Sequence, residues 1–329
     1  MKYQRSHFYI VLILILRYIC NNIDKGMDAL EEREVILPPH FNRNTMYQVL
    51  EQCINKDLVP TCDKVIFNLE LLVFIEPSGI TILSNLFEWL LANNCKIGIK
   101  YMRYTSSHPN SENRRVMQFI SDIGFLSRYT ESDISEPLGI RGNTCPLELI
   151  NYQESVNWVR NIFVPWIAGI LYVDVADLSY LQNALEEIFN NIADHSTVKT
   201  ACISAQYFPK SDQIKVCVSD FGVGVSGTLK AKFPKLSDSE LMRKATEDGV
   251  SSRNQPHNKG AGIGTIIAAI TSNNLGIVHI HSNHGIIIAK KDNLSCSQKE
   301  SFYPGTFYEF DIDAKIAREE RNPKEEFAW

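Results

Sequence analysis

The order in which apolar segments follow one another most strongly constrains the fold of this chain. Between residues 34 and 130, short apolar runs alternate with amphipathic stretches, and the clearest pair is the run at 64–75 followed by the helical period at 79–94. This alternation predicts an α/β sandwich with a largely parallel sheet. From residue 153 onward, helical segments come first and strand-like segments follow. That order predicts a second sandwich of the α+β class, with a mixed, mostly antiparallel sheet.

The change of pattern divides the chain into segments. Residues 131–152 carry turn formers without a sustained period, so we expect a linker there, between a domain at 34–130 and a domain at 153–313. Residues 314–329 are expected to form a charged tail. A chain of 329 residues is long enough for two hydrophobic cores.

Residues 1–33 are expected to lie outside both domains as an N-terminal extension. Residues 8–20 are strongly apolar and follow two basic residues, as in a signal peptide, but Arg17 interrupts the run, which is short for a membrane span. Two explanations stay open. Either Met27 is the true start of the protein, or the apolar run is a membrane anchor or a buried strand.

Cysteine spacing and net charge narrow the range of functions. The eight cysteines include no CxxC pair, which argues against a zinc ribbon and favours reduced, packed cysteines in a cytoplasmic protein. The net charge of −5 gives no general electrostatic reason to expect nucleic-acid binding.

Residues 181–195 predict a helix with two distinct faces. Four apolar residues fall within one narrow arc and form a core-facing stripe: Leu181, Leu185, Ile188 and Ile192. Glu187, Asn191 and Asp194 are spaced so that they stack in a second arc beside this stripe, and His195 follows. Taken alone, the second arc is also typical of an ordinary solvated helix face.

Two glycine motifs follow this helix. In a predicted hairpin at 200–225, Asp220 lies at the end of the second strand, and Gly222 and Gly224 follow it. Glycines there permit close backbone approach to a flat ligand, and a carboxylate can accept hydrogen bonds from an exocyclic amine. Many β-turns share this short pattern.

Farther along the chain, an apolar helix is predicted to begin at three glycines, Gly260, Gly262 and Gly264. The unpaired backbone N–H groups at such a helix start can bind phosphates. The segment is not a Walker P-loop, because no GK[ST] follows, and it fits the dinucleotide fingerprint poorly.

The order of these motifs resembles the GHKL ATPase superfamily (the Bergerat fold), which includes histidine-kinase catalytic domains, gyrase-type ATPases and anti-sigma serine kinases. The resemblance covers about 155–313, with a polar lid at 226–259 between the glycine motifs. It implies that Asn191 supplies an oxygen to a Mg²⁺ ion that bridges the phosphates of ATP. It also implies that Glu187, one helical turn earlier, is the general base.

The same resemblance implies roles for the remaining motif residues. Asp220 would hold the adenine amino group, with Thr306 near the same end of the site. The glycines would shape the base pocket, seat the phosphates and hinge the lid: Gly222, Gly224, Gly260, Gly262 and Gly264. Asp194 and His195 match the acidic–His ending of the family's helix motif.

The N-terminal half, about 34–130, resembles a STAS domain, the fold of anti-sigma factor antagonists. In that family a strand ends in an acidic–Ser–Ser–Gly turn whose last serine is the phosphoacceptor. Here the turn consists of Glu76, Pro77, Ser78 and Gly79, so Ser78 takes the acceptor position, although proline replaces the first serine and glutamate the usual aspartate. The competing interpretation is that Ser78 is the N-cap of the following helix.

Together these resemblances imply two functional hypotheses. The first is an ATP-binding signalling protein, a Mg-dependent ATPase or serine-kinase-like phosphotransferase, whose STAS-like module is a sensor, docking surface or internal substrate. The alternative is a non-catalytic switch, in which ATP closes the lid and changes a protein-interaction surface. We expect a regulatory protein partner or a second copy of the chain, no nucleic acid, and no membrane unless residues 8–20 are an anchor.

Overall fold

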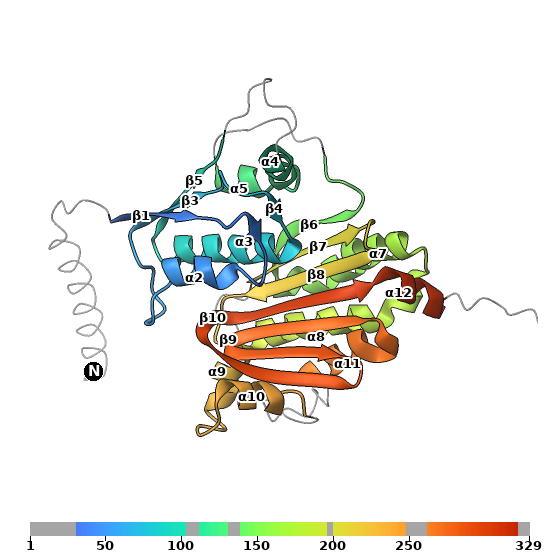
Figure 1. Ribbon diagram of the computed structural model, residues 1–329. Coiled ribbons are helices and arrows are strands. Elements are labelled where there is room, and N and C mark those ends of the chain that lie inside the picture. Colours follow the sequence, from blue (N-terminus) through green and yellow to red (C-terminus); the bar gives the residue numbers. More distant parts are fainter. Residues whose placement is uncertain (1–30, 103–111, 131–138, 196–199, 248–261, 322–329) are drawn as a thin grey trace, which may run out of the picture.

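The computed structural model describes residues 31–102, 112–130, 139–195, 200–247 and 262–321. They form a mixed α/β structure, which confirms the predicted class at this level. We call the described residues up to 130 the N-terminal unit and those from 139 the C-terminal unit. The N-terminal unit lies on one face of a large C-terminal sheet, and long helices cover the opposite face (Figure 1).

The N-terminal unit is built on parallel strands. Its central sheet has the order β1-β3-β5, with β1 (Glu32–Ile36), β3 (Lys64–Asn68) and β5 (Lys96–Lys100). A second parallel pair consists of β2 (His40–Phe41) and β4 (Phe74–Ile75). The helices of this unit are α2 (Met46–Cys53), α3 (Pro77–Ala92), α4 (Glu112–Asp122) and α5 (Phe125–Tyr129). The alternating order and parallel pairing agree with the sequence pattern.

The apolar run at 64–75 forms two strands, β3 and β4, instead of one. The chain turns between them because the Asn68 side chain accepts a hydrogen bond from the backbone N–H of Glu70, at 2.9 Å, and Leu72 N–H donates to the carbonyl of Leu69. An asparagine whose side chain bonds the backbone two residues on is a common turn former. Apolar composition alone did not reveal this turn.

The C-terminal unit has a five-stranded sheet of order β6-β7-β8-β10-β9, and every neighbouring pair is antiparallel. Its strands are β6 (Thr144–Asn151), β7 (Thr200–Phe208), β8 (Gln213–Asp220), β9 (Gly276–Lys290) and β10 (Asn293–Asp313). Its larger helices are α6 (Tyr152–Trp158), α7 (Val164–Leu171), α8 (Ser179–His195), α9 (Gly224–Lys230), α10 (Asp238–Lys244), α11 (Ile263–Thr271) and α12 (Ala314–Arg321). Short turns of other helix types are η1 (Val159–Phe163), η2 (Val175–Leu178) and η3 (Ser272–Asn274).

The predicted linker at 131–152 contains strand β6, so the boundary between the units lies earlier than expected. The register of β6 against β7 shifts between Cys145 and Glu148. Because of this bulge, Cys145 and Leu147 pack into different cores, although residues two apart on a regular strand share a face. The bulge removes the alternation by which a strand is recognised in a sequence.

The predicted charged tail at 314–329 begins with a packed helix, α12. Ala314 and Ala317 are buried in the C-terminal core, and Arg318 forms an ion pair with Asp212 at 2.9 Å. Residues 322–329 lie outside the described part of the chain.

Helix α3 joins the two units. It packs on β7 and β8, where its Thr81 hydroxyl lies 2.7 Å from the Ser204 hydroxyl. Farther along the helix, Asn85 donates a hydrogen bond of 2.7 Å to the Ser219 hydroxyl. Apolar residues of this sheet face belong to the same core as the N-terminal unit, among them Cys202, Cys217, Tyr303 and Phe307. The described cysteines are all free, in agreement with the expectation of reduced, packed cysteines.

Within the described ranges, no single helix has the length and hydropathy needed to cross a membrane. One bent pair, 153–171 with 175–193, passes such a test on combined composition, but its two parts meet at an angle of 109°.

Candidate functional site

The predicted base-binding residues Asp220 and Thr306 are direct partners at one end of the C-terminal sheet. Asp220 ends β8 and lies opposite Thr306 on β10, which in turn lies opposite Ser282 on β9. All three residues are buried, and the Ser282 and Thr306 hydroxyl oxygens lie 3.3 Å apart. A carboxylate and two hydroxyls therefore form one polar row across three strands.

This polar row faces helix α8. On β8, Ser219 bonds α3 of the N-terminal unit, so its neighbour Asp220 points to the other side of the sheet. On β10, Phe307 packs into the core under α3, whereas Tyr308 packs into the core under α8, and Thr306 shares the face of Tyr308.

Two glycines allow the chain after Asp220 to approach this row closely. Gly224 has a φ of +76°, and a Cβ atom there would lie 2.6 Å from the Ser282 hydroxyl. Gly305 has a φ of +103°, and a Cβ atom there would lie 2.2 Å from the Asp220 carbonyl oxygen. Both backbone conformations favour glycine, and both positions lack room for any side chain. Gly222, also predicted to shape the pocket, lies half-buried in the loop between Asp220 and α9.

Side chains of β9 hold the start of α9 in place. The Ser282 hydroxyl accepts a hydrogen bond from Val225 N–H and donates one to the Gly305 carbonyl, each at 2.8 Å. The Asn283 side chain accepts from Gly227 N–H at 3.0 Å. Residues 224–230 are therefore an anchored helix. Part of the predicted polar lid at 226–259 is thus helical, in α9 and α10, whereas residues 248–261 lie outside the described part of the chain.

Glu187 and Asn191 lie one turn apart on α8 and are both half-buried. The stripe beside them is buried as predicted and packs into the C-terminal core: Leu181, Leu185, Ile188 and Ile192. Within the described residues, the Asn191 side chain makes no hydrogen bond, so its amide oxygen is open to a ligand. The side chains of Asp194 and His195, at the end of α8, lie outside the described part of the structure.

Tyr308 links Glu187 to the polar row. Burial of its phenol raises the pKa of Tyr308, and the negative charges of Asp220 and Glu187 raise it further. Both carboxylates therefore act on the same side chain, one from the end of β8 and the other from α8. The structure thus brings the predicted general base and the predicted adenine ligand to one side of the sheet.

Helix α11 lies beside α8 and begins at the second glycine motif. Gly262 is the N-cap residue of α11, without a side-chain cap, and a Cβ atom on Gly264 would lie 2.6 Å from the Thr246 carbonyl. The helix packs on α8 and β9. Gly260 lies outside the described residues.

A cation at this site would depend on few protein ligands. The described residues contain no group of three or more His, Cys, Asp or Glu side chains that could hold a metal ion. Magnesium usually keeps several waters and takes only one or two protein oxygens besides the phosphates of its nucleotide. The unbonded amide oxygen of Asn191 fits that requirement.

A buried charge cluster lies on the opposite face of the sheet, at the seam between the units. Lys215 Nζ lies 2.7 Å from Asp311 and 3.2 Å from Glu76, and Arg43 forms an ion pair with Glu309. The Glu309 side chain is fully buried, and burial raises the pKa of this carboxyl although both cations oppose the shift. These groups fasten the N-terminal unit to β8 and β10.

The predicted phosphoacceptor Ser78 lies in the first turn of α3 and is fully buried. Its hydroxyl makes no hydrogen bond within the described residues. The interpretation of Ser78 as a helix N-cap is wrong, because the N-cap residue is Glu76 and the helix begins at Pro77. The turn cannot shift outward freely, since a Cβ atom on Gly79 would already lie 2.3 Å from the Phe41 carbonyl. Phosphorylation of Ser78 therefore requires α3 to leave this position.

Comparison of the chain with protein-family models, with curated proteins and with solved structures gives no match. Three residues of this site, Ser282, Asn283 and Gly305, were not predicted from the sequence. Of these, only Gly305 was recognisable in the sequence, because it directly precedes the predicted site residue Thr306.

Proposed function

We propose that this protein is an ATP-binding regulatory protein of the GHKL class, a Mg-dependent ATPase or serine-kinase-like phosphotransferase with a STAS-like regulatory unit. The observation that carries the proposal is the pairing of Asp220 with Thr306, beside Gly224 at the start of α9 and Gly305 on β10. These residues lie on the sheet face that α8 covers.

The polar row suits the edge of an adenine ring. Asp220 can accept a hydrogen bond from the exocyclic amine, and the Thr306 hydroxyl can donate to a ring nitrogen. Gly224 and Gly305 let the loop after Asp220 pack closely beside this edge. A carboxylate at this position favours a base with an exocyclic amine, because only such a base can donate a hydrogen bond to it.

The phosphates would lie between α8 and α11. The N-terminus of α11, where Gly262 provides no side-chain cap, offers N–H groups to an anion. Asn191 would hold Mg²⁺ through its amide oxygen. The ion, when bound, would neutralise and orient the phosphate oxygens.

Glu187 would accept the proton of the attacking group. It precedes Asn191 by four residues, so both side chains emerge from the same side of α8. A carboxylate in this position can orient and deprotonate a water molecule or a serine hydroxyl that attacks the terminal phosphate.

Calorimetric titration of the full chain with ATP and ADP, with and without Mg²⁺, tests binding; absence of affinity for both nucleotides would overturn the proposal. Turnover is tested with Glu187→Gln, which should retain binding and lose activity about a hundredfold or more. The matched control is Glu186→Gln, which removes the charge that pairs with Arg160, keeps an oxygen for the hydrogen bond from Gln182, and should keep both properties.

One contact favours the alternative, a non-catalytic switch. Asn85 on α3 bonds Ser219, the residue directly before Asp220, so the N-terminal unit contacts the strand that ends in the base pocket. Nucleotide binding at Asp220 would then alter the seam between the units. Binding of ATP without turnover by the unmutated chain, and without labelling of Ser78 or another residue from labelled ATP, would support the switch over the enzyme.

A further inference from the structure

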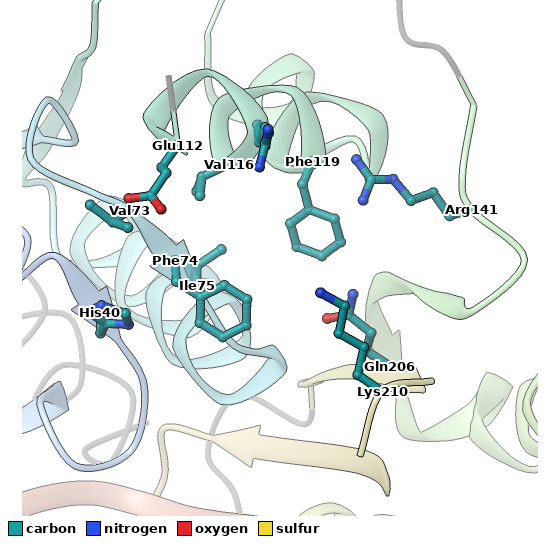
Figure 2. A pocket seen from close by; sticks show the side chains of 11 residues that line it. His40, Val73, Phe74, Ile75, Glu112, Val116, Phe119, Arg141, Gln206 and Lys210 are labelled. Atoms are coloured by element: carbon teal, nitrogen blue, oxygen red, sulfur yellow. The ribbon is translucent and has the colours of Figure 1, made fainter. Parts of the chain in front are cut away.

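A second site of different chemistry lies at the far end of the C-terminal sheet. A cavity of about 620 Å³ opens between the N-terminal unit and the turn that joins β7 to β8. Figure 2 shows side chains from α4, β4 and this turn pointing into it. Because β8 is eight residues long, the cavity is roughly 20 Å or more from Asp220 at the other end of the strand. The two sites are therefore separate.

The floor of the cavity is apolar and aromatic. Phe74 on β4 is 39% exposed at the cavity wall, and Val116 and Phe119 on α4 lie nearby. The centroid of the Phe74 ring lies 6.4 Å from that of Phe208 and 6.2 Å from that of His40. An exposed aromatic ring inside a hollow of this size is typical of a small-molecule site.

The rim of the cavity carries a surplus of positive charge. Arg115 comes from α4, Arg141 from the segment before β6, and Lys210 from the β7–β8 turn. Within the described residues, none of these three side chains makes a hydrogen bond or ion pair. Among the described residues that line the cavity, Glu112 is the one carboxylate. Unpaired cations that converge on one hollow favour an anionic ligand, and arginine suits carboxylates, sulfonates and phosphates in particular.

We propose that this cavity binds a small organic anion with an apolar or aromatic body. The body would lie on Phe74 and Phe119, and the anionic group would bind Arg115, Arg141 and Lys210. A volume of about 620 Å³ suits a ligand of metabolite size. Since Arg115 belongs to the N-terminal unit and the other two cations to the C-terminal unit, the ligand bridges the seam and stabilises the docked arrangement.

The first test uses 8-anilinonaphthalene-1-sulfonate, an aromatic sulfonate whose fluorescence rises on binding, with the full chain and no nucleotide. The double variant Arg115→Gln/Arg141→Gln should bind the probe about tenfold or more weakly, because two charge-assisted contacts are lost. The control is Lys56→Gln/Arg128→Gln, which removes the same charge at exposed residues outside the cavity and should change affinity less than about twofold. Equal affinities for the two double variants would overturn the proposal.

The second test compares competitors for the probe. Phenyl phosphate should displace it at a concentration about tenfold or more below that of inorganic phosphate, because only the former can bury a ring on the aromatic floor. Equal competition would show that the apolar floor contributes nothing, and the proposal would fall. Neither test uses ATP or the residues near Asp220, so the outcome is independent of the proposed function.

Discussion

Acidification should loosen the seam between the units through His281, which lies on β9 under α2. The Tyr47 hydroxyl oxygen lies 2.9 Å from Nδ1 of this histidine, so the two groups share a hydrogen bond inside the seam. Burial lowers the pKa of His281 to about 3, and nearby positive groups act in the same direction. In the unfolded chain, the pKa of a histidine is about 6.5.

The sign and size of the effect follow from proton linkage. Between pH 6.5 and pH 3, the unfolded chain holds a proton on His281 that the folded protein lacks, so the free energy of unfolding falls as the pH falls. The slope is about 1.4 kcal/mol per pH unit, and His281 alone should therefore cost about 2 kcal/mol at pH 5 relative to pH 7.5. His279, whose burial lowers its pKa to about 4, changes stability in the same direction.

Urea unfolding at pH 7.5 and pH 5.0 measures this loss. His281→Gln keeps an oxygen that can accept from Tyr47 and cannot titrate, so its loss between the two pH values should be about 2 kcal/mol smaller than that of the unmutated chain. The control is His40→Gln, at an exposed histidine whose ring lies near Phe74 and not Tyr47, and this variant should keep the original pH dependence. Equal losses for the unmutated chain and His281→Gln would refute the reasoning.

Two further predictions concern stability, both measured by urea unfolding. Gly305→Ala should lower the free energy of unfolding by about 3 kcal/mol or more, because the φ of Gly305 is +103° and a Cβ atom would meet the Asp220 carbonyl. The control Gly142→Ala, at a glycine with open space around it, should change stability by less than about 0.5 kcal/mol. Similar losses at both glycines would contradict the close approach at Gly305. Ser78→Ala removes a buried hydroxyl that lacks a partner and should leave stability unchanged or raise it by about 1 kcal/mol. The control Ser84→Ala, on the same helix, removes a hydroxyl that bonds Tyr129 and should lower stability by about 1 kcal/mol. A comparable loss for Ser78→Ala would show that the Ser78 hydroxyl does have a hydrogen-bond partner.

Helix α3 was predictable from the sequence because its apolar period is long and uninterrupted: the expected range was 79–94 and the observed helix is Pro77–Ala92. Strand β6 was not, because the bulge after Cys145 breaks the alternation by which strands are recognised. The early part of the predicted lid was missed for a different reason. Its helix α9 depends on hydrogen bonds from β9, about 60 residues later in the chain, which no local pattern reveals.

In the candidate site too, local patterns were predictable from the sequence, whereas contacts that depend on distant strands were not. The sequence predicted only that Asp220 and Thr306 lie near the same end of the site. Their direct pairing depends on the register of β10 against β8. The register depends on the whole sheet and on the turns that join its strands. The sequence of one strand considered alone therefore does not specify it. Ser282 joins the polar row only through that register.

The position of α3 bears on which role suits the N-terminal unit. If Ser78 were an internal substrate, α3 would have to lift from the sheet in each cycle, which would break the bond between Asn85 and Ser219 and expose apolar surface from both units. Each lost hydrogen bond costs about 1 kcal/mol, and exposed apolar area adds about 25 cal/mol per Å², so the docked state should predominate. A sensor needs no such separation, because Asn85 already contacts the residue that precedes Asp220. If the protein binds ATP as proposed, this geometry favours an N-terminal unit that responds to the nucleotide over one that accepts its phosphate.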